Sequence, residues 1–347
     1  MRPRNYNQEA LNPRQAAREQ GPGEIARILK TTGYVIRRAT LQDLWLALDR
    51  AVPLLAGGPA GTGKTALAEA LAAGFNLNLY EITGHPGQEP RDVIGSWNRR
   101  AQDRAEEMAL QAGRSLEAAR RERWRDEFYD CGELLDAYRD AAEAANQDAA
   151  PPVLLIDEVE KLPVPIQHIL LQPFARGFVS IPKLAGVIGV DDLRRTPIVI
   201  LTTNNLELLD DPLRDRCILT RITAPQPVEE IAIFRARVPH APAQLIAGAA
   251  KLLKKIREDM DEIRYKPGIR NAVMLMSAMA DHGLDRITAQ SLEPYIGCLA
   301  RGERDDINLR DALATLERAA NRANAVIDDA VERAFKPELY LCKESAA

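Results

Sequence analysis

A glycine-rich segment that ends in lysine and threonine carries the strongest chemical signal in this sequence of 347 residues. The segment fits the pattern G-x-x-x-x-G-K-[ST], and its residues are Gly58, Pro59, Ala60, Gly61, Thr62, Gly63, Lys64 and Thr65. Glycines let successive backbone N–H groups point at phosphate oxygens, and a helix that follows adds the positive end of its dipole. We expect Lys64 to reach the β- and γ-phosphates and the Thr65 hydroxyl to bind Mg²⁺. The alternative is a glycine-rich turn that binds nothing.

Two acidic residues directly follow an apolar run and are suited to complete a phosphate site. The run at 153–156 predicts a buried strand, and Asp157 and Glu158 come at its carboxyl end. Ligands of open α/β sheets bind at this end of the strands. We expect Asp157 to hold Mg²⁺ directly or through water, and Glu158 to act as the general base that polarises an attacking water. The alternative is an acid pair that caps a helix.

A third polar signal follows the apolar run at 198–201. Thr202, Thr203, Asn204 and Asn205 again place polar side chains at the carboxyl end of a predicted strand. We expect the amide of Asn204 to orient the attacking water. Asn205 is its nearest competitor, and a plain turn is the remaining alternative.

The elements that must position these residues follow an α/β pattern up to about residue 225. Short apolar runs predict strands at 52–56, 77–82, 153–156 and 198–201. Apolar residues at helical spacing lie between the runs, and a first helix is expected at 41–48 after a possible cap at Thr40. Continuous apolar strands that alternate with helices predict a parallel sheet with helices on both faces.

The sequence pattern also divides the chain. We expect a flexible tail at 1–22, because prolines and polar residues there lack apolar periodicity. A nucleotide-binding α/β domain is expected at 23–225, with an insertion of one or two long surface helices, and no strands, at 99–147. A helical domain is then expected at 226–305 and a helical extension at 306–347, with helical spacing at 231–238, 243–256, 271–279 and 312–335.

The composition excludes several classes of protein. Apolar residues make up 46% and charged residues 28%, which is ordinary globular usage and excludes disorder of the whole chain. The 46 basic and 50 acidic residues give a net charge of −4, so no general attraction to nucleic acid is expected. No apolar run is long enough to span a membrane, and residues 1–5 lack the apolar stretch of a signal peptide. We therefore predict a soluble, cytoplasmic protein.

Cysteines and histidines are too scattered to indicate a zinc site, a redox pair or a serine-type triad. These residues are Cys131, Cys217, Cys298, Cys342, His85, His168, His240 and His282.

The order of the motifs resembles that of the AAA+ ATPases. The glycine-rich loop, the strand that ends in acids and the strand that ends in Asn204 are followed by the arginine-containing segment 211–217. The segments 91–98, 178–182 and 237–239 are similar to the MoxR branch, and the closest likeness is to ATPases that mature carbon monoxide dehydrogenase. The similarity covers about residues 33–300. It implies a P-loop NTPase core with a small helical lid.

The resemblance also implies cofactors and further site residues. It implies bound ATP with Mg²⁺, and a homo-oligomeric, usually hexameric, ring in which an arginine of one subunit completes the site of its neighbour. Arg216 matches this arginine best and Arg214 is the alternative, whereas the structural alternative is an ion pair of Arg216 with Asp215 or Asp211. Arg270 matches a lid arginine that contacts the γ-phosphate, or it is a solvated lid residue.

The family likeness implies a chaperone driven by ATP hydrolysis, which remodels or matures a partner protein or metalloenzyme. A client with a von Willebrand factor A domain is expected. The alternatives are a nucleic-acid motor or restriction-type NTPase, and a nucleotide-gated defence scaffold. The loop at 83–88 and the hairpin-like segment at 179–190 take positions near a central pore in the family, and the alternative is that both are ordinary surface loops. They lack the aromatic–hydrophobic pair of loops that pull polypeptide through such a pore.

Overall fold

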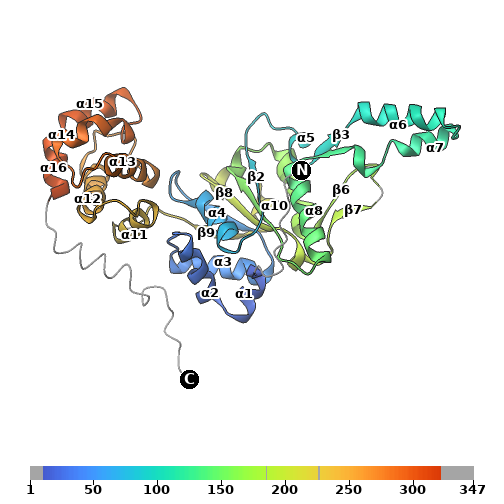
Figure 1. The fold of residues 1–347 in the computed structure, drawn as a ribbon, viewed down its shortest axis with the longest axis horizontal. Helices are drawn as coiled ribbons and strands as arrows, with labels where there is room; N and C mark the ends of the chain where they lie inside the picture. Colours follow the sequence, from blue (N-terminus) through green and yellow to red (C-terminus); the bar gives the residue numbers. More distant parts are fainter. Residues whose placement is uncertain (1–10, 185, 226, 322–347) are drawn as a thin grey trace, which may run out of the picture. The chain divides into compact units, whose positions relative to one another are not determined.

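The structure is a computed structural model that describes residues 11–184, 186–225 and 227–321 (Figure 1). The chain forms two compact units. Apart from the undescribed positions, the first unit comprises residues 11–28, 38–58 and 64–221, and the second comprises 29–37, 59–63 and 222–321.

A parallel sheet of five strands forms the centre of the first unit. In spatial order the strands are β2 (Leu79–Thr83), β5 (Val153–Asp157), β8 (Ile198–Thr203), β1 (Leu54–Gly57) and β9 (Ile218–Arg221). All neighbouring pairs are parallel, and their register sets Thr83 opposite Asp157 and Gly57 opposite Thr203. The carboxyl ends of β2, β5, β8 and β1 therefore lie next to one another at one edge of the sheet.

Helices cover this sheet because its central strands are buried along their whole length. Every residue of β1 and β8 is buried, which is the pattern of strands covered on both faces. The main helices of the unit are α3 (Arg38–Arg50), α4 (Lys64–Gly74), α8 (Glu133–Asn146) and α9 (Val164–Arg176), and the short helices are α5 (Pro90–Val93) and α10 (Asp211–Arg214). The predicted α/β class with a parallel sheet is confirmed.

The region at 99–147 differs from the predicted insertion of surface helices. It begins with α6 (Arg99–Gln111) and α7 (Leu116–Glu122), which extend beyond β3 (Gly95–Trp97) in Figure 1. A strand, β4 (Tyr129–Cys131), then pairs antiparallel with β3. The prediction that strands stop here is wrong, because three residues suffice to close this ribbon. We call residues 95–131 the arm.

The last part of the same region is core rather than insertion. In α8, Leu134, Leu135 and Tyr138 are almost completely buried and pack in the cluster that contains β5 and β8 residues. Their spacing places them on one face of the helix. The inserted element is therefore the arm, and α8 is a covering helix of the sheet.

Aromatic side chains fix the base of the arm. Trp97 meets Trp124 and Tyr129 edge to face, with ring centroids 5.1 Å and 5.0 Å apart. The ammonium of Lys183 lies 4.1 Å from the centroid of a Trp124 ring. Lys183 follows β6 (Phe178–Ser180), which pairs antiparallel with β7 (Val187–Gly189) in the hairpin expected at 179–190. The cation–π contact thus joins this hairpin to the arm.

The second unit is helical, and its core extends further along the chain than predicted. Its helices include α11 (Pro227–Arg237), α12 (Ala243–Asp259), α13 (Ile269–Asp281), α14 (Ala289–Leu292), α15 (Glu303–Asp311) and α16 (Leu313–Asn321). Leu309 and Leu316 are fully buried in one cluster with α12 and α13. Residues 306–321, which we expected in a separate extension, therefore belong to this core. The rest of that extension and of the helix predicted at 312–335 lies outside the described residues.

Residues 11–22 also differ from the prediction of a flexible tail at 1–22, whose first ten residues lie outside the described part of the chain. Helix α1 (Pro13–Glu19) begins after Asn12, whose side chain accepts a hydrogen bond from the Arg14 N–H, and α2 (Pro22–Thr31) follows. The Arg14 guanidinium donates to the carbonyls of Arg194, Thr196 and Pro197 at 2.6–2.9 Å. Burial lowers the Arg14 pKa to about 10. A single buried arginine thus ties α1 to the segment that precedes β8.

None of the helices in the described part of the chain has both the length and the apolar character that crossing a membrane requires.

We predict that Arg14→Met lowers the free energy of unfolding by about 2 kcal/mol, because three carbonyl oxygens lose a charged donor while the shape is nearly kept. Arg18→Met, at an exposed position of the same helix, is the matched control. Urea unfolding of both variants measures the difference. Equal midpoints and slopes for the two would show that Arg14 does not hold α1 in place.

Candidate nucleotide-binding and catalytic site

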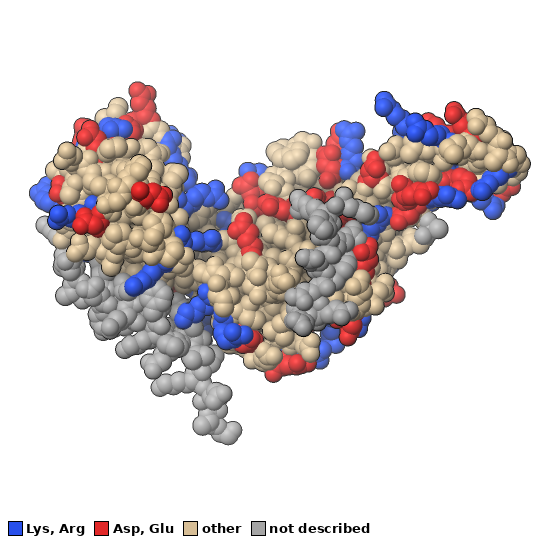
Figure 2. All heavy atoms as spheres, in the orientation of Figure 1, with Lys and Arg blue, Asp and Glu red and all other residues tan. Residues whose placement is uncertain are grey.

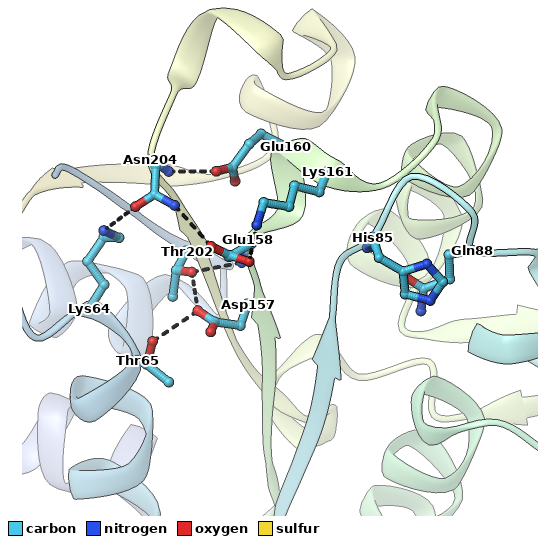
Figure 3. Close-up of polar contacts among 10 residues, drawn as sticks. All are labelled: Lys64, Thr65, His85, Gln88, Asp157, Glu158, Glu160, Lys161, Thr202 and Asn204. Atoms are coloured by element: carbon cyan, nitrogen blue, oxygen red, sulfur yellow. Dashed lines mark hydrogen bonds and ion pairs between the residues drawn. The ribbon is translucent and has the colours of Figure 1, made fainter. Parts of the chain in front are cut away.

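The residues predicted to do chemistry meet at the carboxyl edge of the sheet (Figure 3). Asp157 ends β5, Glu158 follows it, and Asn204 follows β8. Lys64 is the first residue of α4, the helix that the glycine-rich loop joins to β1. Parallel neighbours end side by side, so residues almost 150 positions apart reach hydrogen-bonding distance.

The glycine-rich loop needs its glycines for backbone conformation. Gly61 and Gly63 have φ values of 76° and 94°, in the left-handed region that side chains disfavour. Thr62 donates its hydroxyl to the Pro59 carbonyl at 2.9 Å, which tightens the loop. Within the second unit, the Tyr34 hydroxyl donates to the Gly63 carbonyl at 3.2 Å.

Lys64 is buried and is held by two acceptors. Its ammonium donates to the Gly58 carbonyl at 2.7 Å and to Asn204 Oδ1 at 2.9 Å. Burial lowers the pKa of Lys64, whereas the carboxylates of Asp157, Glu160 and Glu158 oppose this effect and favour the charged form. The ammonium is therefore a directed positive charge at the end of the loop.

Hydroxyl groups orient Asp157 from two sides. Thr65 donates its hydroxyl to Asp157 Oδ1 at 3.0 Å, and Thr202 donates to the same oxygen. The Thr202 hydroxyl in turn accepts the N–H of Glu158 at 3.0 Å. In the sequence, Thr202 stands out only as part of a polar strand end. The signal that would identify it is its position on the strand that pairs with β5, at the end where the acids lie.

These side chains fit Mg²⁺ by their chemistry. A hydroxyl and a carboxylate are hard oxygen donors, and Mg²⁺ takes few protein ligands and completes its shell with phosphate and water. The described residues hold no group of three or more His, Cys, Asp or Glu that would suit a metal bound by protein alone. Thr65 and Asp157 would hold the ion, which would neutralise charge on the phosphates.

Glu158 adopts an unusual backbone and has two side-chain partners. Its φ and ψ of 53° and 47° lie in the left-handed region, which costs a residue with a side chain about 1–2 kcal/mol. Its carboxylate accepts from Lys161 Nζ at 2.5 Å and from Asn204 Nδ2 at 3.3 Å. The ion pair raises the pKa of Lys161. Strain of this kind persists where surrounding contacts fix a functional side chain.

Asn204 rather than Asn205 lies in this network. Its side-chain oxygen accepts from Lys64 and its amide NH₂ donates to Glu158, so it joins the two oppositely charged groups. Its backbone N–H donates to Glu160 Oε1 at 3.0 Å. Asn205 instead accepts the N–H of Glu207 and caps the following turn. Glu160 thus fixes the backbone that carries Asn204. No local motif in the sequence marks this glutamate.

The loop at 83–88 meets the acids through its backbone. Gly84 donates its N–H to the Asp157 carbonyl at 2.8 Å, and a Cβ at Gly84 would lie 2.4 Å from the Glu158 carbonyl oxygen. The side chain of Gln88 accepts the His85 N–H at 3.3 Å, and Figure 3 shows both residues turned away from the network at Asp157. His85 is therefore not brought to the acids.

The arginines at 211–217 differ from each other in their partners. Arg214 forms an ion pair with Asp211. Arg216 donates to the Pro212 carbonyl at 2.7 Å, its buried Nε has no partner, and it pairs with no carboxylate of the described chain. The alternative of an ion pair with Asp215 or Asp211 is thus not what the structure contains. No hydrogen bond joins Arg216 to the network at Asn204 in the described residues.

Arg270 lies in the first turn of α13, in the second unit, and its side chain is exposed.

The fold and this constellation are those of a P-loop nucleotide-binding domain. Residues 53–217 match the AAA domain (dynein-related subfamily). Among curated proteins, the chain is 25% identical over 248 residues to the gas vesicle ATPase GvpN of Haloferax mediterranei, which covers 70% of this chain and 66% of that protein. It is 25% identical over 245 residues to GvpN of Ancylobacter aquaticus, with coverage of 69% and 63%. The chain thus spans slightly less than two thirds of these relatives.

A solved RuvB mutant from Thermotoga maritima is 19% identical to the chain, with a TM-score of 0.46 over 79% of this chain and 73% of that one. The AAA domain confirms the predicted resemblance to AAA+ proteins, and with the ATPases named above it supports an ATPase. The narrower likeness to carbon monoxide dehydrogenase maturation ATPases stays a prediction.

We predict that Thr202→Val reduces ATP turnover at least about tenfold, because Asp157 loses a hydroxyl that orients it. Thr220→Val is the matched control, since Thr220 lies buried on β9, which β1 separates from β8, and its hydroxyl has no partner. Steady-state hydrolysis and thermal unfolding of both variants separate the effect on the site from loss of a buried threonine. Equal turnover in the two variants would contradict the role of Thr202.

We expect Gly84→Ala to destabilise the protein by about 1–3 kcal/mol, because its Cβ would meet a backbone oxygen of Glu158 that cannot move freely. Gly87→Ala, where the nearest atom lies 3.8 Å from the added Cβ, is the control in the same loop. Chemical unfolding compares the two. A Gly84→Ala variant as stable as Gly87→Ala would show that the loop does not pack against the acids as described.

Proposed function

We propose that this protein hydrolyses ATP as a MoxR-type AAA+ ring and uses the energy to remodel or mature a partner protein. The observation that carries the proposal is the hydrogen-bonded series Lys64, Asn204, Glu158, with Asp157 beside it. In this proposal Lys64 is the phosphate-binding cation, Asn204 the water-orienting amide and Glu158 the general base, and their hydrogen bonds support it. An oxygen site for Mg²⁺ adjoins them.

Each side chain has a separate part in the reaction. Lys64 exchanges its contact with Asn204 for oxygens of the β- and γ-phosphates. The freed amide of Asn204 then orients a water, and the Glu158 carboxylate accepts the proton of that water as it attacks the γ-phosphorus. Lys161 pairs with the Glu158 carboxylate and holds it in position. The backbone N–H groups of residues 58–63 hold the phosphates.

The neighbouring subunit supplies an arginine in this proposal. Arg216 supports it because its guanidinium pairs with no carboxylate of the described chain, whereas Asp211 already neutralises Arg214. An arginine donated in trans stabilises charge on the transferring phosphoryl group. Arg270, on the lid, contacts the γ-phosphate in the same ring. Formation of a ring, the hexamer usual in the family, belongs to the proposal.

The client is proposed to be a protein in the cytoplasm. A protein with a von Willebrand factor A domain or a metalloenzyme follows from the MoxR likeness, and the names of the curated relatives add a gas vesicle protein as a candidate. On the face drawn in Figure 2, basic and acidic side chains are interspersed, also on the arm, which does not favour a nucleic-acid substrate.

The test is hydrolysis of ATP by the purified full chain. We expect Lys64→Ala to abolish nucleotide binding and Glu158→Gln to keep binding while it reduces kcat at least about a thousandfold. We expect Arg216→Ala to lose turnover with nearly unchanged ATP affinity, and Arg214→Ala, its control, to remain active. GTP and DNA are tested beside ATP. Turnover that is equal in the wild type and Glu158→Gln would refute the proposal.

A further inference from the structure

A buried glutamine on α9 spans two segments that the proposed function uses. Gln167 is 1% exposed. Its Nε2 donates to the Leu162 carbonyl at 2.9 Å, and its Oε1 accepts the N–H of Asp210 at 3.0 Å. The side chain therefore uses its donor and its acceptor in opposite directions.

One end of this bridge belongs to the chain's own nucleotide site. Leu162 closes the single turn at Val159–Lys161 that begins after Glu158. That turn carries Glu160, which accepts the Asn204 N–H, and Lys161, which pairs with Glu158. Because these contacts tie the turn to the site, we expect a shift of Glu158 to move the Leu162 carbonyl as well.

The other end of the bridge belongs to the segment that carries Arg216. Asp210 precedes α10, and the N–H groups of Leu213 and Arg214 donate to its carbonyl at 3.1 Å and 3.2 Å. The Arg216 N–H donates to the Leu213 carbonyl at 3.2 Å, and its side chain donates to Pro212. Short-range hydrogen bonds therefore connect Asp210 to Arg216.

The bridge lies in an apolar environment that makes it costly to break. Leu162, Ile166, Leu209 and Leu213 are buried in one core cluster around it. A buried polar group without a hydrogen-bond partner is destabilised by its full desolvation free energy, so breaking either contact of Gln167 is unfavourable. On the exposed side, His168 Nε2 lies 2.9 Å from Asp210 Oδ2 and holds the same residue a second time.

We propose that Gln167 is a positioning residue that links each subunit's nucleotide site to the arginine which the same subunit offers to its neighbour. The inference rests on the proposed function. Glutamine suits this role because its amide both donates and accepts, which neither a carboxylate nor a thioether of the same size does. His168 supports the bridge from outside. A misplacement of a catalytic group by 1 Å costs up to about a hundredfold in rate. Loss of the contact that holds Asp210 would therefore lower the rate by shifting Arg216.

The test is complementation between variants in mixed rings of the full chain. In Gln167→Met, each subunit keeps all the side chains of its own site, and the proposal predicts that the arginine it offers is misplaced. In Glu158→Gln, the site is inactive but the arginine is correctly held. We expect Gln167→Met alone to lose at least about tenfold in kcat, with an ATP affinity within about twofold of the wild type. Mixing the two impaired proteins should restore turnover above that of either variant alone.

His168→Ala serves as a second variant that leaves the core untouched. We expect a smaller loss in kcat, of about two- to fivefold, which mixing with Glu158→Gln also repairs. If Gln167→Met does not fold, as judged by its thermal unfolding, His168→Ala decides by the same criteria. Gln172→Ala, on the same helix and bonded to Ser180 rather than to Asp210, is the control that should keep wild-type turnover.

The outcomes separate this inference from the proposed function. Arg216→Ala mixed with Glu158→Gln tests the shared site alone. If that pair regains activity but Gln167→Met with Glu158→Gln does not, Gln167 acts within its own site and the inference is wrong. Wild-type kcat in Gln167→Met overturns it equally. If neither pair regains activity, the shared site itself fails.

Discussion

The arrangement of the site depends on one carboxylate that two hydroxyls hold. Asp157 Oδ1 accepts from Thr65 at the start of α4 and from Thr202 at the end of β8. This joins the end of the glycine-rich loop, the acids and the end of β8 at a single atom. Because Thr202 also accepts the Glu158 N–H, the same hydroxyl fixes the strained backbone of Glu158. The sheet supplies proximity, and these hydroxyls supply orientation.

Local patterns in the sequence were sufficient for the main parts of the site and for the fold class. The glycine-rich loop, Asp157 and Glu158 are each recognisable within a segment of eight residues. Continuously apolar strands indicate a parallel sheet that helices cover on both faces. Contacts between distant segments were not predictable. Gly84, Glu160 and Gln167 are ordinary in their local sequence, and their roles exist only because parallel strands bring remote carbonyls and N–H groups to them.

The differences between the fold expected from the sequence and the observed fold have a common physical origin. The segment at 13–19 is polar and short, so nothing in it indicates that Arg14 finds three carbonyls some 180 residues away. The 99–147 region mixes an exposed pair of helices with a buried one, and its Arg- and Ala-rich composition conceals the apolar face of α8. Asn204 and Asn205 are adjacent and chemically equal, and only the direction of the chain after β8 distinguishes them.

The aromatic cluster at the base of the arm has an optical consequence. The chain has three tryptophans, and two of them, Trp97 and Trp124, lie edge to face with each other, while Trp45 donates its indole N–H to a carbonyl of α1. None of them belongs to the network at Asp157. Intrinsic emission of the protein therefore reports chiefly on the junction between the arm and the β6–β7 hairpin, and Lys183 is the charge placed to quench or shift it.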